Sequence, residues 1–251
     1  MKQDMHSAIV ETSHKAHKSE KRELICEREG KTLYHSEKPD IIIQEFTDIS
    51  PDESKKHSEV KQLCSLRNEI SSYLFGYVEG FHVSTHFVSK FSPTAMVVKR
   101  TELIPMMVRI YNIASGSLVK RFGLKNGKAL DFPVIEHYYG TGKRVPVMVN
   151  EYHMYAFNIT VPEEYKQINR MASKVNAALR GLCDRRQLVL ADLQLAFGRY
   201  KNQVVLSDEL SPFTCHFLDA ALGDRQDKFL PDHENAVESF FELHSRLKAK
   251  V

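Results

Sequence analysis

The amino-acid sequence predicts an α+β fold, and three features carry that prediction. The first half holds short segments rich in Val, Ile and Thr, at 85–88, 95–99 and 103–111, and such segments favour strands. Apolar residues then recur at helical spacing over 168–182. A strand hairpin is expected to follow over 187–210. A strand-rich first half and a long helix before a hairpin are typical of α+β proteins.

Composition narrows the class of protein. The chain has 251 residues, of which 42% are hydrophobic, enough for a sizeable core in one large domain or two small ones. The formal charge of +3 is small and the charges are interspersed, so we expect no nucleic-acid partner. No apolar run approaches the ~20 residues of a membrane helix, and we expect no membrane partner and a cytoplasmic protein. The cysteines form no C-x-x-C pair and are expected to be reduced thiols: Cys26, Cys64, Cys183 and Cys215.

The N-terminal third is expected to begin with a tail and a hairpin. Residues 1–23 are polar and aperiodic, which predicts a flexible tail or a loosely held helix. Apolar segments at 32–34 and 40–47 flank a Lys-Pro pair and predict a β-hairpin. The polar stretch 48–62 is expected to be a loop. Apolar residues spaced by three and four predict an amphipathic helix over 65–79.

The second half continues with a strand over 133–139. Thr160 is expected to cap the long helix, because Glu163 follows three residues later and a proline lies in the first turn. The hairpin is expected to turn over 198–203, where glycine and polar residues interrupt the apolar pattern. An amphipathic helix over 233–247 completes the chain.

A run of small residues, 114–117, follows the strand that ends at Tyr111. Small residues let a backbone turn approach a ligand, but they equally suit a plain structural turn. The sequence around these residues is more specific. The chain reads Y-N-I-A-S-G-S-L-V-K-R from Tyr111 to Arg121, and this resembles the signature of the SAICAR synthetase family, R-N-x-A-A-G-S-L-x-K-R.

Other stretches also resemble motifs of that family. The opening-strand motif G-K-x-K-x-[ILV]-Y, aligned on Tyr34, keeps its second lysine as Lys31. Lys99 matches the lysine of V-K-[KR], although an exposed strand lysine would look the same. The hairpin resembles V-D-F-K-L-E-F-G followed by L-x-D-E-x-S-P. The polar residues, glycine and proline that it keeps are Asp192, Gly198, Asp208, Glu209, Ser211 and Pro212.

The resemblance covers about residues 25 to 230 and implies a two-lobed fold. A small N-terminal antiparallel sheet would lie over a larger sheet-and-helix lobe, with an ATP cleft between them. The implied division is a tail over 1–23, an ATP-lid lobe over 24–110, and a substrate and metal lobe over 111–251.

The resemblance also implies an activity. Members of the family use ATP to join a carboxylated aminoimidazole ribotide to aspartate through an acyl phosphate, in purine biosynthesis. The partners would be small molecules, a nucleotide-like carboxylate and an amino acid, with ATP and Mg²⁺ as cofactors. Lys31 and Lys99 would bind ATP, and Asp208 and Glu209 would bind the metal. The remaining matched positions would bind substrate: Gly116, Ser117, Arg121 and Asp192.

Departures from the family pattern mostly remove charge from the presumed cleft. Ala196 replaces one of two carboxylates expected to hold Mg²⁺. Arginine binds phosphate through two parallel hydrogen bonds, which Tyr or His cannot match. Arg109 lies two positions before Tyr111 and therefore on the same face of the strand. It is a candidate substrate-binding residue that could partly replace the missing arginine. The departures are Glu29, Met107, Tyr111, Gln194, Ala196, Phe213 and His216.

Three interpretations stay open at this stage. The first is the family ligase, which we expect. The second is a ligase of the same fold that uses a less charged substrate, as the lost charges indicate. The third is an inactive homologue that binds nucleotide or a partner protein without turnover.

Overall fold

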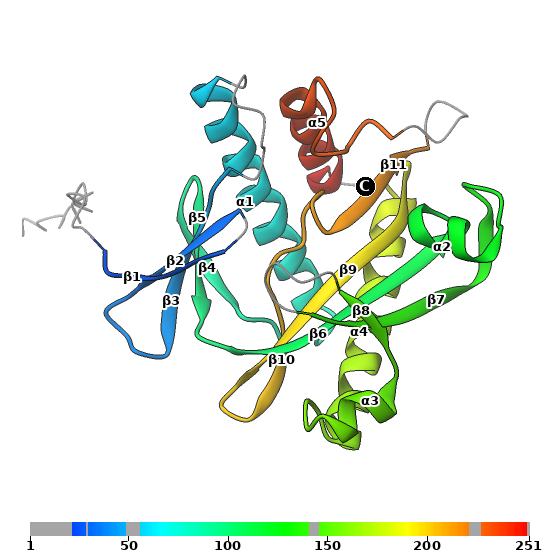
Figure 1. The fold of residues 1–251 in the computed structure, drawn as a ribbon. Coiled ribbons are helices and arrows are strands. Elements are labelled where there is room, and N and C mark those ends of the chain that lie inside the picture. The colour runs from blue at the N-terminus through cyan, green and yellow to red at the C-terminus, as the bar shows by residue number, and fades with distance from the viewer. Residues whose placement is uncertain (1–21, 29, 49–55, 141–145, 221–226, 250–251) are drawn as a thin grey trace, which may run out of the picture.

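The computed structural model describes residues 22–28, 30–48, 56–140, 146–220 and 227–249. Two antiparallel sheets lie next to each other, and helices pack on them (Figure 1). The predicted α+β fold with a smaller N-terminal sheet is therefore confirmed.

The smaller sheet has five strands in the order β1-β2-β3-β5-β4. The predicted hairpin is present, because β2 and β3 pair antiparallel. Isoleucines of β3 and the inward residues of β5 are buried, so the face of this sheet that meets α1 belongs to the core. Its strands are β1 (Leu24–Arg28), β2 (Lys31–His35), β3 (Ile41–Phe46), β4 (Phe87–Ser92) and β5 (Ala95–Lys99).

The larger sheet has the order β10-β9-β6-β7-β8, with β11 also paired to β9. Its two longest strands, β6 and β9, lie side by side at the centre and are the most deeply buried. The strands are β6 (Glu102–Ile113), β7 (Ala129–Tyr139), β8 (Val147–Val149), β9 (Leu188–Tyr200), β10 (Gln203–Ser207) and β11 (Cys215–Asp219).

The three long helices pack on the side of the sheets that holds the core. The long helix α4 (Pro162–Asp184) packs its apolar stripe on β9, whereas α1 (His57–Glu79) and α5 (Ala236–Lys248) run side by side (Figure 1). Two short helices, α2 (Gly116–Phe122) and α3 (Glu151–Ala156), follow β6 and β8. Within the described ranges, none of the helices has the length and apolar character needed to cross a membrane.

A short segment before β4 joins the two sheets. Thr85 forms an isolated parallel bridge with Leu206 of β10. The His86 amide donates to the Leu206 carbonyl (2.8 Å), and the Lys99 amide of β5 donates to the His86 carbonyl (2.7 Å). Residues 84–86 are thus hydrogen-bonded to a strand of each sheet, which fixes the smaller sheet against the larger one.

Several expected boundaries differ from the structure. The division at residue 110 falls inside β6, and this strand pairs with β7 and β9 of the larger sheet; the change of sheet lies between Lys99 and Glu102. The loop expected over 48–62 is wrong for its last part, because α1 begins at His57. The first turns of α1 are largely exposed and carry no apolar period to detect. Residues 1–21 of the expected tail lie outside the described residues.

Two local expectations are also corrected. Val161, not Thr160, is the N-cap of α4, and the Thr160 hydroxyl has no hydrogen-bond partner among the described residues. The hairpin turn is narrower than expected. Lys201 and Asn202 both have positive φ (49° and 62°), as a tight two-residue turn requires, so Gly198 lies inside β9.

Candidate functional site

The first group of predicted residues meets where the two sheets join. Lys31 of β2 places its ammonium against the carboxylates of Asp208, just after β10, and Glu209. The Lys31–Glu209 distance is 2.9 Å. Three residues predicted to bind ATP and metal therefore lie together, but they bind one another.

Arg67 of α1 completes this group from the other side. Its guanidinium donates from Nε to Glu209 Oε2 (2.6 Å) and also from Nη2 to Glu209 Oε1. Nη1 donates to the Gly30 carbonyl (3.0 Å), and the guanidinium carbon lies 4.9 Å from the centre of the Phe46 ring and 4.3 Å from that of the Phe213 ring. Arg67 is 2% exposed, so Glu209 is held by a buried, stacked cation.

The charges of this group stabilise one another. Burial alone would lower the pKa of Lys31, but the carboxylates of Glu209 and Asp208 outweigh it and raise that pKa above its usual value. Burial would raise the pKa of Glu209, yet the charges of Lys31 and Arg67 hold that pKa well below its usual range. Lys31 and Glu209 are therefore both charged at neutral pH.

Asp208 is the member of this group best placed to bind a ligand. Its side chain is 35% exposed, and its backbone has a left-handed φ of 72°. Gln44 of β3 donates to the Asp208 carbonyl (3.1 Å) and holds this conformation. Both oxygens of Glu209 are already bound. A Mg²⁺ ion that keeps several waters and phosphate oxygens fits Asp208 as one protein ligand, but Glu209 does not fit as a second.

Neither Lys99 nor the acidic residues add a preformed metal or phosphate site. The Lys99 ammonium donates to the Thr85 carbonyl (2.8 Å) and lies 5.7 Å from the centre of the Tyr200 ring. Across the part of the chain that the structure describes, no three His, Cys, Asp or Glu side chains gather as metal ligands.

A second group lies on the larger sheet around Asp192 of β9. We call Arg109, Ser115, Asp192, His216 and Asp227 the Asp192 cluster. Arg109 donates to Asp192 Oδ1 (2.9 Å), and Ser115 donates to Oδ2 (2.7 Å). His216 of β11 contacts Asp192 Oδ2 through Nδ1 (3.1 Å) and Asp227 through Nε2.

The contacts within the Asp192 cluster shift the pKa values of Asp192 and His216. Burial would raise the pKa of Asp192, but the hydrogen bond from His216 and the charge of Arg109 lower it overall. Burial would lower the pKa of His216, but its hydrogen bonds to Asp192 and Asp227 raise it above the usual value. The imidazole therefore favours its charged form between two carboxylates.

The signature stretch lies beside this cluster. The Tyr111 hydroxyl hydrogen-bonds to Ser117 (3.0 Å), and the Arg109 guanidinium lies 5.0 Å from the centre of the Tyr111 ring. Gly116 has a positive φ of 51°, which a side chain would strain. Arg121 also lies on this face of the sheet, because it binds both oxygens of Glu136 (2.7 Å each), and Glu136 is the cross-strand partner of Arg109.

Asn112 of the signature has a structural role. Its amide exchanges two hydrogen bonds with the amide of Asn176 on α4 (2.8 and 2.9 Å) and donates a third to the Leu190 carbonyl (3.1 Å). Both side chains are buried, so this pair ties β6 to α4.

Three residues in the first group were missed by sequence reasoning: Arg67, Gln44 and His86. Arg67 and Gln44 each interrupt a buried apolar pattern, which was the available signal. His86 gave none. It is 3% exposed, neither ring nitrogen has a hydrogen-bond partner among the described residues, and burial together with Lys31 and Lys99 lowers its pKa to about 3. It is a neutral imidazole between the two predicted ATP lysines.

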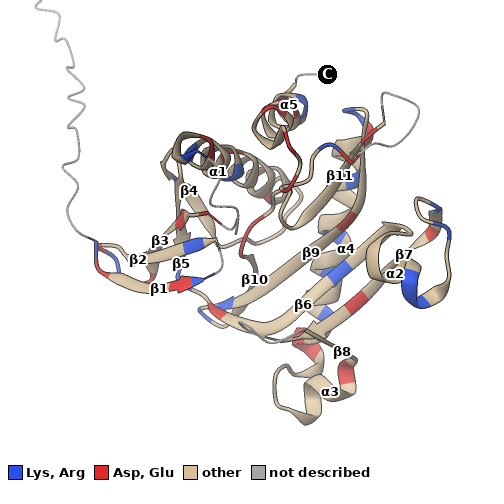
Figure 2. Ribbon diagram, turned by 45° about the horizontal axis from the view of Figure 1, so that its top comes forward, with Lys and Arg blue, Asp and Glu red and all other residues tan. Residues whose placement is uncertain are grey.

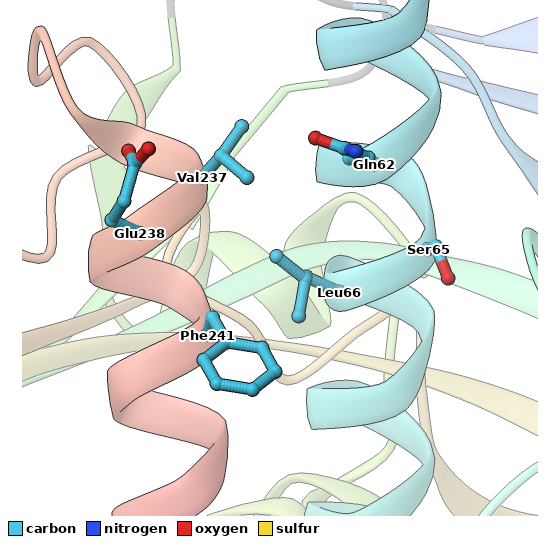
Figure 3. Close-up of a pocket in the computed structure, with 6 residues that line it drawn as sticks. All are labelled: Gln62, Ser65, Leu66, Val237, Glu238 and Phe241. Atoms are coloured by element: carbon cyan, nitrogen blue, oxygen red, sulfur yellow. The ribbon is translucent and has the colours of Figure 1, made fainter.

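A groove of about 480 Å³ lies away from both groups, between α1 and α5 (Figure 3). None of the predicted site residues lines it. The close-up shows Phe241 and Leu66 directed toward each other across the gap between the helices. Its lining is Gln62, Ser65, Leu66, Val237, Glu238 and Phe241.

Comparison with known proteins identifies what this arrangement resembles. The family model described as SAICAR synthetase matches residues 24–233. The phosphoribosylaminoimidazole-succinocarboxamide synthase of Chloroherpeton thalassium is 36% identical over 230 residues, 90% of this chain and 98% of the relative. The crystal structure of the enzyme of that name from Ehrlichia chaffeensis has a TM-score of 0.81 at 31% identity, covering 91% of this chain and 100% of the other. A SAICAR synthetase structure in complex with ADP has a TM-score of 0.79 at 30% identity, covering 91% and 98%.

Proposed function

Because the chain belongs to the SAICAR synthetase family, ATP-dependent ligases of purine biosynthesis, we propose that it forms an amide between an aminoimidazole-type carboxylic acid and the amino group of aspartate. The observation that carries this is the meeting of Lys31 with Asp208 and Glu209 at the junction of the sheets. The relative solved with ADP supports nucleotide as the ligand of this fold. The cysteines among the described residues are free, which agrees with a cytoplasmic site of action.

The reaction needs an activated carboxyl group. A carboxylate oxygen of the acid attacks the γ-phosphorus of ATP, and ADP leaves. The aspartate amine then attacks the acyl carbon, phosphate leaves with the electrons of the broken C–O bond, and the nitrogen loses a proton. The protein contributes chiefly by positioning the reactants and by stabilising the charge that develops on phosphate.

We assign the first step to the junction of the sheets. Lys31 would turn from Asp208 toward the phosphates as a point cation, and Lys99 would add a second cation nearby. Asp208 would hold Mg²⁺, which neutralises phosphate charge when bound. Gln44 supports this role, because it fixes the backbone of Asp208.

We assign binding of the acid substrate to the Asp192 cluster. The Asp192 cluster and Ser117 present donors and acceptors from β6, β9, β11 and the start of α2. Arg109 is held in place by Asp192 and by the Tyr111 ring, which gives it the fixed orientation that a substrate-positioning residue requires.

Calorimetric titration with a non-hydrolysable ATP analogue, with and without Mg²⁺, tests the proposal. We expect the unaltered protein to bind more tightly with Mg²⁺, and Asp208→Ala to lose that gain. Asp131→Ala is the matched control, because Asp131 is an exposed carboxylate on β7. Failure of the unaltered protein to bind nucleotide in either condition would refute the ligase function.

A further inference from the structure

His86 is a buried polar side chain that the mechanism described so far does not use. It is 3% exposed, and neither ring nitrogen forms a hydrogen bond within the described residues. Burying a polar group without a hydrogen bond costs free energy, so the great majority of buried polar groups have a partner. An imidazole that lacks one while Lys31 is bound to Asp208 is a candidate to gain one when that ion pair opens.

The backbone fixes where the His86 ring lies. Its amide donates to the Leu206 carbonyl of β10 (2.8 Å), and its carbonyl accepts from the Lys99 amide of β5 (2.7 Å). The ring packs edge-on against the buried Phe75 of α1, with 5.0 Å between the ring centres. Figure 2 shows the acidic segment that follows β10, which carries Asp208, at the side of the larger sheet that meets the smaller one. The imidazole is therefore held at the junction of the sheets.

Two ammonium groups and one carbonyl surround the ring. Burial and then the charges of Lys31 and Lys99 lower the pKa of His86 to about 3, and the Asp208 carbonyl acts in the opposite direction. A neutral imidazole has one N–H donor and one acceptor lone pair. The N–H suits the carbonyl, and the lone pair suits an ammonium group.

Lys31 is the ammonium group that can change its partner. Lys99 donates to the Thr85 carbonyl (2.8 Å), a backbone contact for which neither phosphate nor metal competes. Lys31 is bound to Asp208 and to Glu209 Oε1 (2.9 Å). A metal ion on Asp208 competes with Lys31 for the same carboxylate. Because an ammonium group has three N–H donors, Lys31 could then keep Glu209 and still donate to two other acceptors.

We infer that His86 is a positioning residue: its unprotonated ring nitrogen accepts a hydrogen bond from Lys31 when a metal ion occupies Asp208, and this directs the ammonium group at the nucleotide phosphates. Lys31 then donates one N–H each to Glu209, His86 and phosphate. The inference rests on the proposed ligase function, in which Lys31 binds the nucleotide and Asp208 its metal. It makes His86 important for nucleotide binding with Mg²⁺ and unimportant without it, because Lys31 then stays with Asp208.

The test is calorimetric titration of His86→Phe and His86→Gln with a non-hydrolysable ATP analogue, with and without Mg²⁺. Phenylalanine keeps the ring against Phe75 but removes the acceptor, whereas glutamine supplies an acceptor. We expect His86→Phe to bind the analogue about tenfold more weakly with Mg²⁺ and equally well without it, the size expected for a hydrogen bond to a charged group. We expect His86→Gln to recover most of the loss. An equal loss in both conditions that glutamine does not recover would overturn the inference, because it would show a structural role only.

Two further variants make the test specific to Lys31. His86→Phe in a Lys31→Met background should cause no further loss of affinity with Mg²⁺, because the donor is already gone. A further tenfold loss there would overturn the inference. His244→Phe is the matched control, because His244 lies on α5 and its Nε2 is likewise buried without a hydrogen-bond partner among the described residues. Thermal unfolding without nucleotide checks that each variant is folded.

Nitrogen-15 NMR of the unaltered protein, labelled at histidine, keeps the inference testable if His86→Phe does not fold. The His86 signals are those absent from the spectrum of His86→Gln. We expect the unprotonated nitrogen of His86 to shift when Mg²⁺ and the analogue are added together, but not with the analogue alone. Normal Mg²⁺-dependent binding without this shift would overturn the inference and leave the ligase function standing. Failure of the unaltered protein to bind nucleotide in either condition would instead refute the ligase function, and the inference with it.

Discussion

Lys31 and Asp208 are 177 positions apart in the chain, yet their side chains form an ion pair at the junction of the two sheets. We propose that Lys31 binds the nucleotide and that Asp208 binds its metal, and in the structure the charge of each neutralises the other. A cation that binds Asp208 would free Lys31 for phosphate. We therefore expect Mg²⁺ and nucleotide to bind with positive coupling.

Asp208→Asn measures this coupling. The neutral amide no longer holds Lys31, so we expect metal-free affinity for an ATP analogue to rise several-fold while the effect of Mg²⁺ shrinks. Titration calorimetry with and without chelator gives both numbers, and Asp131→Asn is the control. Weaker metal-free binding in Asp208→Asn would show that Asp208 does not hold Lys31 back.

Arg67 and Glu209 are predicted to matter chiefly for stability. Both are almost fully buried, and removing Arg67 leaves the Glu209 carboxylate in the interior with Lys31 but without the two hydrogen bonds from the guanidinium. Arg67→Met should lower the free energy of unfolding by about 3–5 kcal/mol. Urea denaturation measures this, and Arg67→Met combined with Glu209→Leu should recover part of the loss because the incompletely compensated carboxylate of Glu209 is gone. A double variant that loses the sum of the two single effects would contradict this account.

Because of His216, the protein should lose stability as the pH rises above the raised pKa of this residue. Its pKa is raised in the folded protein, mainly by Asp192 and Asp227 against the effect of burial. The stabilisation is thus fully present below the usual histidine pKa of about 6.5 and is lost as pH rises through the raised value. The stability difference between the unaltered protein and His216→Asn should therefore shrink from pH 5.5 to 8.5. The exposed His57, changed to Asn, is the control, and a difference that grows with pH would have the wrong sign.

Gly198 and Gly76 should respond to alanine in opposite directions. A Cβ at Gly198 would lie 2.8 Å from Thr101 Cβ, so Gly198→Ala should destabilise by about 1–3 kcal/mol. Gly76 is exposed within α1, and a Cβ there meets nothing within 4 Å. Gly76→Ala should stabilise by about 0.5–1 kcal/mol through helix propensity. Thermal unfolding compares them; equal effects would contradict the steric account of Gly198.

Much of the fold could be predicted because local patterns encode it. The apolar stripe of α4 and the short apolar segments of β2 and β3 need no tertiary information. The start of α1 could not be predicted, because its first turns are exposed and polar. Gly198 was expected in a turn, and only the approach of Thr101 explains a glycine within β9.

The sequence predicted which residues belong to the candidate site, but it did not predict the contacts between them. Lys31, Asp208 and Glu209 were expected near a nucleotide, yet their pairing depends on strands distant in sequence. Arg67 interrupts an apolar pattern, but its partner could not be foreseen, because an arginine in a helix gives no sign of a glutamate 142 positions away. The geometric role of Asn112 was likewise hidden within a signature that suggested ligand binding.

The order of strands in the larger sheet has a consequence for the chain as it is synthesised. Arg199 of β9 contacts Glu102 of β6 across 97 positions, so β6 and β7 leave the ribosome as a hairpin with one edge open until β9 is made. Lys31 and Arg67 are made earlier still, and their carboxylate partners follow β10. A chain interrupted before Asp208 would carry two unpaired cations at positions that the fold buries. Stable burial of the N-terminal sheet therefore awaits near-completion of synthesis.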